Sequence, residues 1–295
     1  MSKRALILIN PVAGRGTAKS KVFDMVNVFA SHGFTSTVLP TLPGELLIGQ
    51  VKDELAGHDL LVIVGGDGTL NRSVNAIMHS GAEIPVGYIP LGSTNDFGKS
   101  LGLSSNVLKA CESICEKEPN PIDIGCFDGK YFVYIACTGV FTEASYATPQ
   151  HLKNAFGHSA YLVKGISTLA ESHSTVYRVE TSDGKKYECE CIFASVSNSL
   201  RAGGIVKLPK SAVSFDDGMF ELIMVPTPKN AISGTMLVAD VLNSDITSKS
   251  LIYLKSDRFR FEFDTPHAWS LDGENGGETL SSEISVIEKA IYLIR

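Results

Sequence analysis

The stretch LLVIVGGDGTL, residues 60–70, decides the fold. Leu60–Val64 is apolar at every position, as a strand buried on both faces of a parallel sheet requires. The glycines that follow let the backbone approach a ligand closely and adopt positive φ. Beyond them, residues 70–78 place apolar side chains at i, i+4, i+7 and i+8, which is one helical stripe. A buried strand, a glycine loop and an amphipathic helix in this order indicate a βαβ unit.

The same alternation fills the first part of the chain. Apolar runs suited to buried strands lie at Ala5–Ile9, Phe34–Leu39 and Ile84–Ile89, with helix-like segments between them. Strands that alternate with helices form a parallel sheet with helices on both faces. We therefore predict an α/β fold whose N-terminal domain, residues 1–121, is a doubly wound parallel sheet.

The second part of the chain has a different pattern, which becomes mostly β after about residue 121. A hairpin signal stands at Ser182-Asp183-Gly184, and two helices are expected at about 150–171 and about 228–243. The prolines at 119 and 121 end the helix before them. We predict a β-rich C-terminal domain, residues 122–295.

Composition excludes several classes of protein. The 295 residues are 44% hydrophobic and carry a net charge of −6, which is ordinary for a soluble globular enzyme and gives no basic field for nucleic acid. Ala5–Ile9 is too short for a signal-peptide core, and no stretch approaches the roughly 18 apolar residues of a membrane span. We expect a cytoplasmic protein whose six cysteines are reduced, structural thiols.

Asp67 indicates which ligand the first glycine loop binds. A carboxylate beside a phosphate is repulsive unless a cation such as Mg²⁺ lies between them. The loop therefore suggests a magnesium-complexed nucleotide. A dinucleotide fingerprint would need glycine at position 71, which is Asn71, and a plain turn before a helix would need one glycine rather than three.

Two further loops follow predicted strands. The first is NPVAGRGT, residues 10–17, which fails the phosphate-binding P-loop pattern because positions 13 and 18 are alanine. The second is PLGSTNDFG, residues 90–98, which gathers hydroxyl, amide and carboxylate groups. All three loops leave the carboxyl ends of parallel strands, where open α/β sheets bind their ligands. A simple strand-to-helix turn is the alternative for residues 10–17.

These motifs, with IDIG at 122–125 and LDGE at 271–274, resemble the catalytic domain shared by diacylglycerol kinases, sphingosine and ceramide kinases and bacterial soluble lipid kinases. The resemblance covers essentially the whole chain. It implies an NAD kinase/diacylglycerol kinase-like architecture with the active site in the interdomain cleft. It also implies an ATP- and Mg²⁺-dependent lipid kinase of phospholipid metabolism. The expected reaction converts diacylglycerol to phosphatidic acid. An NAD kinase, which shares GGDGT, and a non-catalytic nucleotide-binding module are the alternatives.

The resemblance assigns ATP binding to residues of all three loops and to one hydroxyl after the second strand. They are Asn10, Pro11, Gly14, Thr41, Gly65, Gly66, Asp67, Gly68, Thr69, Asn71, Ser93, Thr94 and Asn95. The family pattern in the third loop is G-T-x-N-D, whereas this chain has Gly-Ser-Thr-Asn-Asp at 92–96. Serine replaces threonine at position 93, so the hydroxyl is kept.

Catalytic and metal roles follow from the same resemblance. Asp67, Asp96 and Asp123 match the acidic network that holds the catalytic Mg²⁺ through water, and Glu274 matches the general base. Ser214, Asp217 and the carbonyl of Met219 match a second, structural metal site. The alternatives are an exposed strand residue at 123, a simple turn at 217–218 and a glycine-rich hairpin at 272–277.

A lipid kinase implies a lipid partner. With a net charge of −6 we expect the protein to lie in the cytoplasm, peripheral to the membrane, and to contact it transiently. The candidate contact is residues 200–210, which mix apolar side chains with Arg201, Lys207 and Lys210; a solvated surface is the alternative. A homodimer is possible.

Overall fold

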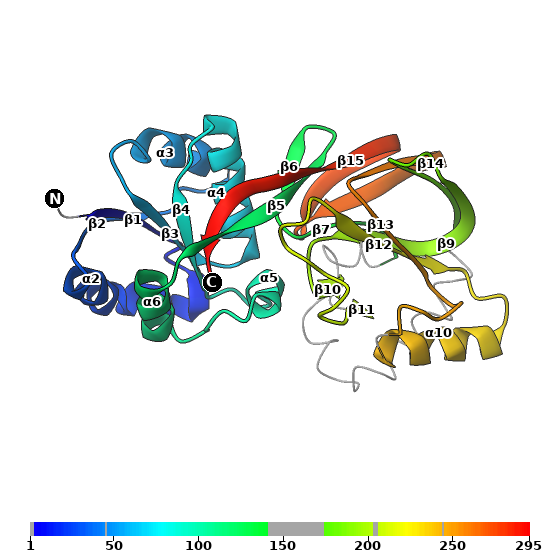
Figure 1. Ribbon diagram of the computed structural model, residues 1–295, viewed down its shortest axis with the longest axis horizontal. Coiled ribbons are helices and arrows are strands. Elements are labelled where there is room, and N and C mark those ends of the chain that lie inside the picture. The colour runs from blue at the N-terminus through cyan, green and yellow to red at the C-terminus, as the bar shows by residue number, and fades with distance from the viewer. Residues whose placement is uncertain (1–2, 45, 141–173, 203–205, 244) are drawn as a thin grey trace. The chain divides into compact units, whose positions relative to one another are not determined.

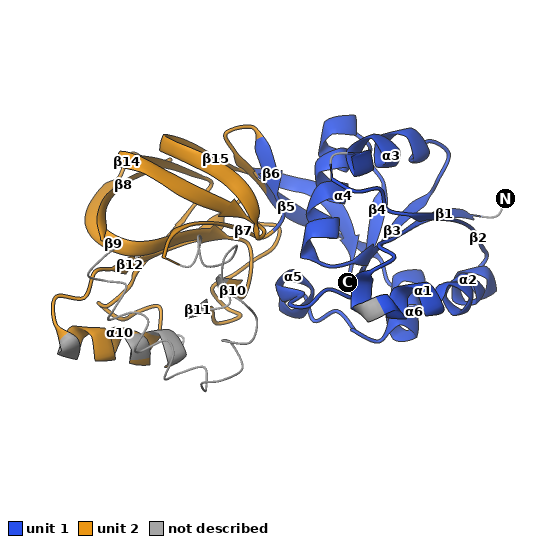
Figure 2. Ribbon diagram, turned by 180° about the vertical axis from the view of Figure 1, so that it is seen from behind, with its two compact units in different colours: residues 1–124, 130–133, 287–295 blue, residues 125–129, 134–286 orange. Residues whose placement is uncertain are grey.

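The computed structural model describes all residues except 1–2, 45, 141–173, 203–205 and 244, so the helix expected at 150–171 lies outside the described residues. The chain forms two compact units (Figure 2): unit 1 is residues 1–124, 130–133 and 287–295, and unit 2 is residues 125–129 and 134–286. The sequence predicted one boundary after residue 121. Unit 1 also takes in the C-terminal residues, because the apolar end of the last strand pairs with its sheet.

The sheet of unit 1 is parallel. Its strands β1 (Lys3–Ile9), β2 (Phe34–Pro40), β3 (Leu60–Gly65) and β4 (Pro85–Pro90) lie in the order β2-β1-β3-β4. Beyond β4, residues 292–294 of β15 (Glu274–Ile294) pair with it in parallel, and β5 (Pro119–Phe127) pairs with β15. All of β3 is buried, as its unbroken apolar run predicts.

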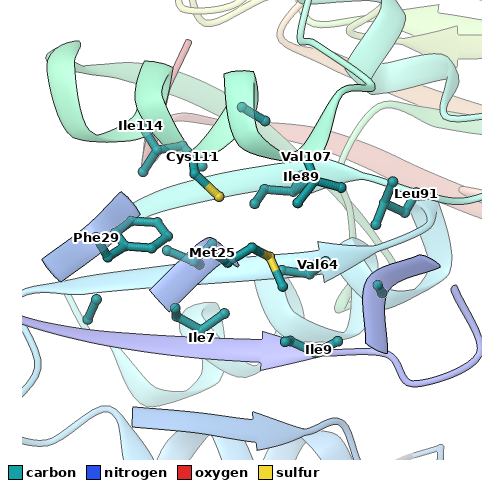
Figure 3. Close-up of a cluster of buried hydrophobic side chains, with 14 of the residues drawn as sticks. Ile7, Ile9, Met25, Phe29, Val64, Ile89, Leu91, Val107, Cys111 and Ile114 are labelled. Atoms are coloured by element: carbon teal, nitrogen blue, oxygen red, sulfur yellow. The ribbon is translucent and has the colours of Figure 1, made fainter. Parts of the chain in front are cut away.

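Helices cover both faces of this sheet (Figure 1). The helices α2 (Val22–Ser31) and α6 (Val107–Glu116) pack together on one face, and α3 (Leu46–Glu54) and α4 (Asp67–Ser80) on the other. Figure 3 shows Met25 and Phe29 of α2 and Ile114 of α6 meeting apolar residues of the strands. A Cβ at Gly87 would lie 2.7 Å from the Ile114 side chain, so glycine on β4 lets α6 pack closely. The predicted doubly wound α/β arrangement is confirmed.

Short helical turns follow two of the strands of unit 1. They are the 3₁₀ turn η1 (Ala13–Gly16) with α1 (Thr17–Ser20) after β1, and α5 (Asp96–Ser100) after β4. The strand β6 (Lys130–Phe132) also belongs to this unit and packs against α4.

Unit 2 is built mainly of antiparallel strands, as the sequence predicts. They are β7 (Ile135–Gly139), β8 (Thr175–Thr181), β9 (Lys186–Ser197), β12 (Phe220–Pro226), β13 (Ile252–Ser256), β14 (Arg258–Leu271) and the first part of β15. The two long strands β9 and β14 each pair with β8 along one half and with β7 along the other, which closes a circuit of four strands. The aromatic rings of Phe127 and Phe261 pack on Trp269 in its core.

Smaller elements complete unit 2. A two-stranded ribbon joins β10 (Arg201–Ala202) to β11 (Val206–Lys207), and α10 (Ala231–Asn243) contacts β11. Among the described residues, no helix combines the length and the apolar character needed to cross a membrane.

All six cysteines are free thiols. Burial raises the pKa of Cys111 to about 12 and that of Cys137 to about 12, so both remain protonated at neutral pH. Inert, protonated thiols within packed units fit the structural role predicted for them.

Candidate active site

Backbone hydrogen bonds join the three loops that follow β1, β3 and β4. The Leu91 N–H donates to the Gly65 carbonyl at 2.7 Å, and the Gly14 N–H donates to the Leu91 carbonyl at 2.8 Å. The Asn10 N–H donates to the Val64 carbonyl at 2.8 Å. The predicted convergence of these loops at one edge of the sheet is therefore a direct contact.

Asn95 shapes the third loop with its own side chain. Its backbone is left-handed, with φ of 50°, a conformation that asparagine tolerates better than most residues. Its Oδ1 accepts the Gly92 N–H at 2.7 Å, and its Nδ2 donates to the Gly92 carbonyl at 2.9 Å. Both ends of the amide are engaged within the loop, so Asn95 acts on a ligand through the backbone that it fixes.

Asp67 is the first residue of α4 and lies at the centre of this arrangement. It is 9% exposed, and its Oδ2 accepts a hydrogen bond from the Thr94 hydroxyl at 3.2 Å. Its Oδ1 is buried without a hydrogen-bond partner. Burial raises the pKa of Asp67, the Thr94 hydroxyl lowers it, and the nearby carboxylate of Asp96 raises it again.

This carboxylate suits a cation. A buried carboxylate oxygen without a donor is costly, and hard oxygen ligands are those that Mg²⁺ prefers. Asp67 and Asp96 lie at the starts of α4 and α5, close enough for the Asp96 charge to raise the pKa of Asp67, so a divalent ion held by them would also relieve this repulsion. The residues present therefore fit the magnesium ion that the nucleotide loops imply.

The other predicted ATP-binding residues lie around these loops in several environments. The Asn10 Nδ2 donates to the Thr69 hydroxyl at 3.1 Å, which joins the first loop to the second. The Thr41 N–H donates to the carbonyl of Ile9, the last residue of β1. Ser93 is exposed at the surface of the third loop. Pro11 is also exposed, beside Asn10.

Asn71 lies on α4 and faces the segment 130–133. It is 8% exposed, its Nδ2 donates to the Tyr131 carbonyl at 3.4 Å, and Asn75 donates to its Oδ1 at 3.2 Å. These contacts tie α4 to that segment within unit 1.

Asp123 is held by a different contact from the other two predicted acidic residues. It lies on β5, is fully buried, and its Oδ1 accepts the Lys289 N–H at 2.7 Å. Lys289 has φ of 51°, so this carboxylate supports an irregular turn of the backbone in β15. The structure thus brings Asp67 and Asp96 together, whereas Asp123 accepts a hydrogen bond from the backbone of Lys289.

Glu274 occupies the tip of the hairpin between β14 and β15 in unit 2. Asp272 and Gly273 both have positive φ, of 51° and 89°, as a two-residue type I′ turn requires, and Leu271 pairs with Glu274 across it. Glu274 is exposed. Asp272 is buried, and its Oδ1 accepts the N–H groups of Tyr134 and Ile135, each at 3.0 Å.

Sequence reasoning missed the role of Asp272. The Asp-Gly pair signals a hairpin, but its partners lie more than a hundred positions away in the sequence. The Asp272 N–H also donates to the Ile135 carbonyl at 2.8 Å, so three hydrogen bonds fix the turn that carries Glu274.

The residues of the predicted structural metal site lie in the loop before β12. The Ser214 hydroxyl donates to Asp216 Oδ1 at 3.1 Å, and the Met219 N–H donates to Asp217 Oδ1 at 3.1 Å. Asp217 Oδ2 lies 2.8 Å from the ammonium of Lys255 on β13. Lys255 carries no motif and was not singled out from the sequence.

Comparison with known proteins identifies the family of this chain. Residues 4–127 match the model of the diacylglycerol kinase catalytic domain. The diacylglycerol kinase of Bacillus subtilis (strain 168) is 33% identical over 294 residues, which is 99% of this chain and 96% of that protein. The chain belongs to the diacylglycerol kinase family. This membership, and the lipid kinase class with it, confirms the resemblance seen in the motifs.

Other relatives of this diacylglycerol kinase family member extend the comparison. The diacylglycerol kinase of Staphylococcus carnosus (strain TM300) is 32% identical over 279 residues, covering 94% of this chain and 90% of that protein. A crystal structure of a diacylglycerol kinase from Bacillus anthracis str. Sterne aligns with a TM-score of 0.77 at 21% identity, covering 99% of this chain and 96% of that one. A second structure from that organism aligns with a TM-score of 0.83 at 23% identity, covering 99% and 95%. At these identities the structures support the fold.

Proposed function

We propose that the protein transfers the γ-phosphoryl group of ATP to the free hydroxyl of diacylglycerol, giving phosphatidic acid and ADP, in a Mg²⁺-dependent reaction. The observation that carries this proposal is the buried Asp67, whose Oδ1 has no hydrogen-bond partner. It lies where the loops that follow β1, β3 and β4 meet. The names of the curated relatives supply the lipid.

The loops of unit 1 bind the nucleotide in this proposal. The first turn of α4 has N–H groups not used within the helix, which favour an anion. Gly66 and Gly92 let the loops after β3 and β4 cross in close contact, and Gly65 leaves room for the Thr69 side chain. Asp67 and Asp96 would hold Mg²⁺, which would compensate the charge on the phosphate oxygens.

Glu274 acts as the general base. As the lipid hydroxyl oxygen forms its bond to the γ-phosphorus, the bond from that phosphorus to the ADP oxygen breaks, and Glu274 accepts the hydroxyl proton. Its exposure leaves the carboxylate accessible to the substrate hydroxyl. Asp272 and the type I′ turn give it a fixed backbone.

The test is phosphoryl transfer from ATP labelled at the γ-phosphate. The acceptors are diacylglycerol, ceramide, a sphingoid base and phosphatidylglycerol in mixed micelles, together with NAD. We expect labelled phosphatidic acid, dependent on Mg²⁺ and abolished in Asp67→Asn. Label in NADP without labelled lipid would overturn the proposal in favour of an NAD kinase.

The lipid substrate implies contact with a membrane. We propose that the protein works in the cytoplasm as a peripheral enzyme and that the β10–β11 ribbon makes this contact. Arg201 and Lys207 are cross-strand partners in it, so two cations lie side by side. Cations near an anionic surface each contribute about 1 kcal/mol. Homodimer formation stays a prediction, which light scattering would check.

A further inference from the structure

The ammonium of Lys255 lies among three oxygen acceptors in unit 2. Asp217 Oδ2 is 2.8 Å from Nζ, Glu221 Oε1 is 3.1 Å away, and the Ala212 carbonyl oxygen is 3.4 Å away. The ammonium donates a hydrogen bond to the Ala212 carbonyl and forms ion pairs with both carboxylates. Two of them, Ala212 and Asp217, come from the loop that precedes β12.

The position of Lys255 is fixed by the sheet. Glu221 on β12 and Lys255 on β13 are directly opposite in the antiparallel register, so their side chains leave the same face. The side chain of Glu221 is fully buried, whereas those of Asp217 and Lys255 are 34% and 27% exposed. Burial raises the pKa of Glu221 to about 7 and Lys255 lowers it, so the cation favours the ionised carboxylate, which would be strongly destabilising if unpaired.

The same loop holds the residues expected to bind a structural metal. Of that expected set, both carboxylate oxygens of Asp217 are already engaged, one by the Met219 N–H and one by Lys255. The Ser214 hydroxyl donates to Asp216. A divalent ion at Asp217 Oδ2 would meet the ammonium of Lys255, and two cations cannot share that oxygen without strong repulsion.

We propose that Lys255 is the built-in cation of this loop and takes the place of a divalent metal ion there. The ammonium ties the loop 212–219 to β12 and β13 through Asp217, Glu221 and the Ala212 carbonyl. The loop then needs no metal to be ordered, and the protein requires Mg²⁺ only where Asp67 and the nucleotide bind it. This last consequence rests on the proposed function, whereas the role of Lys255 does not.

The test measures thermal unfolding of chelator-treated protein without nucleotide, with and without Mg²⁺. All variants carry Asp67→Asn, so that Mg²⁺ at the nucleotide loops contributes nothing. Lys255→Met removes the charge and keeps most of the side-chain length. Lys255→Met with Glu221→Gln removes both charges of this ion pair, and serves if the single variant does not fold. Asp217→Asn is the control for any metal bound to the loop.

We expect neither chelator nor millimolar Mg²⁺ to change the melting temperature of the Asp67→Asn protein. Lys255→Met should lower it by roughly 10 °C, because Glu221 is left buried and unpaired. Adding Glu221→Gln should recover most of that loss. The proposal is overturned if Mg²⁺ stabilises the Asp67→Asn protein and Asp217→Asn abolishes that effect, or if Lys255→Met melts at the same temperature as its parent. Because no lipid or ATP is used, failure here leaves the kinase assignment untouched.

Discussion

The backbones of Gly66 and Gly92 pass so closely that neither residue has room for a side chain. A Cβ added to Gly92 would lie 2.6 Å from the Gly66 Cα, and one added to Gly66 would lie 3.0 Å from the Gly92 Cα. Neither glycine has positive φ, so the requirement is space rather than backbone conformation. This crossing joins the loop that carries Asp67 to the loop that carries Thr94.

Gly92→Ala should therefore damage nucleotide binding. The new methyl group would also meet Asn95 Oδ1 at 2.8 Å, so the third loop must move away from Asp67. We expect the free energy of unfolding to fall by about 1–3 kcal/mol. The KM for ATP should rise together with this loss. Gly49→Ala on α3 is the matched control, because a Cβ at Gly49 meets open space. This variant should leave the KM for ATP unchanged, and its stability should stay the same or improve. Equal behaviour of the two variants would contradict the role of the crossing.

Asp67→Asn should separate activity from stability. The substitution keeps the size of the side chain but removes the charge that holds Mg²⁺, so kcat should fall at least about 10²-fold. Because burial raises the pKa of Asp67, its ionised form costs the folded state stability at neutral pH. The variant should thus melt at or above the temperature of the parent in metal-free buffer. A clear loss of stability would show that Asp67 is needed for folding instead.

Glu274→Gln should lower kcat without altering stability. Glutamine cannot accept the hydroxyl proton, and the contribution of a general base is at least about 10²-fold. Glu274 is exposed, so unfolding should be unaffected. Steady-state kinetics with a detergent-dispersed lipid gives the value. Near-normal turnover would remove Glu274 from the base role.

Asp272 offers a test of how that base is positioned. The two N–H groups of Tyr134 and Ile135 need an acceptor, which an asparagine Oδ1 also supplies. We expect Asp272→Asn to retain most of the kcat and Asp272→Ala to lose it, with the KM for ATP little changed in both. If Asp272→Asn is as inactive as Glu274→Gln, the carboxylate itself takes part in the reaction.

Local chemistry explains which features could be predicted from the sequence. The buried run Leu60–Val64, the loops at strand ends and the Ser182–Gly184 hairpin are encoded by neighbouring residues. Long-range pairing is not encoded in this way. Ile291–Ile294 has the pattern of a strand, but nothing in that pattern says that it joins β4. Asp272 and Lys255 likewise derive their roles from partners that only the fold brings close.

The last prediction concerns the membrane contact of the β10–β11 ribbon. Arg201 and Lys207 lie opposite one another on two short strands, an arrangement of like charges that is unfavourable unless an anion lies beside them. Reversing both to glutamate should weaken binding to anionic vesicles by on the order of 10²-fold, since each cation contributes about 1 kcal/mol and each new carboxylate is repelled.

Reversing the exposed Lys52 and Lys117 of unit 1 changes the net charge equally and is the matched control. Binding by the parent should also fall as salt rises, because screening shortens the range of these charges. Vesicle sedimentation at low and high salt measures both effects. Equal sedimentation of the parent and the Arg201/Lys207 variant would show that the ribbon is solvated surface.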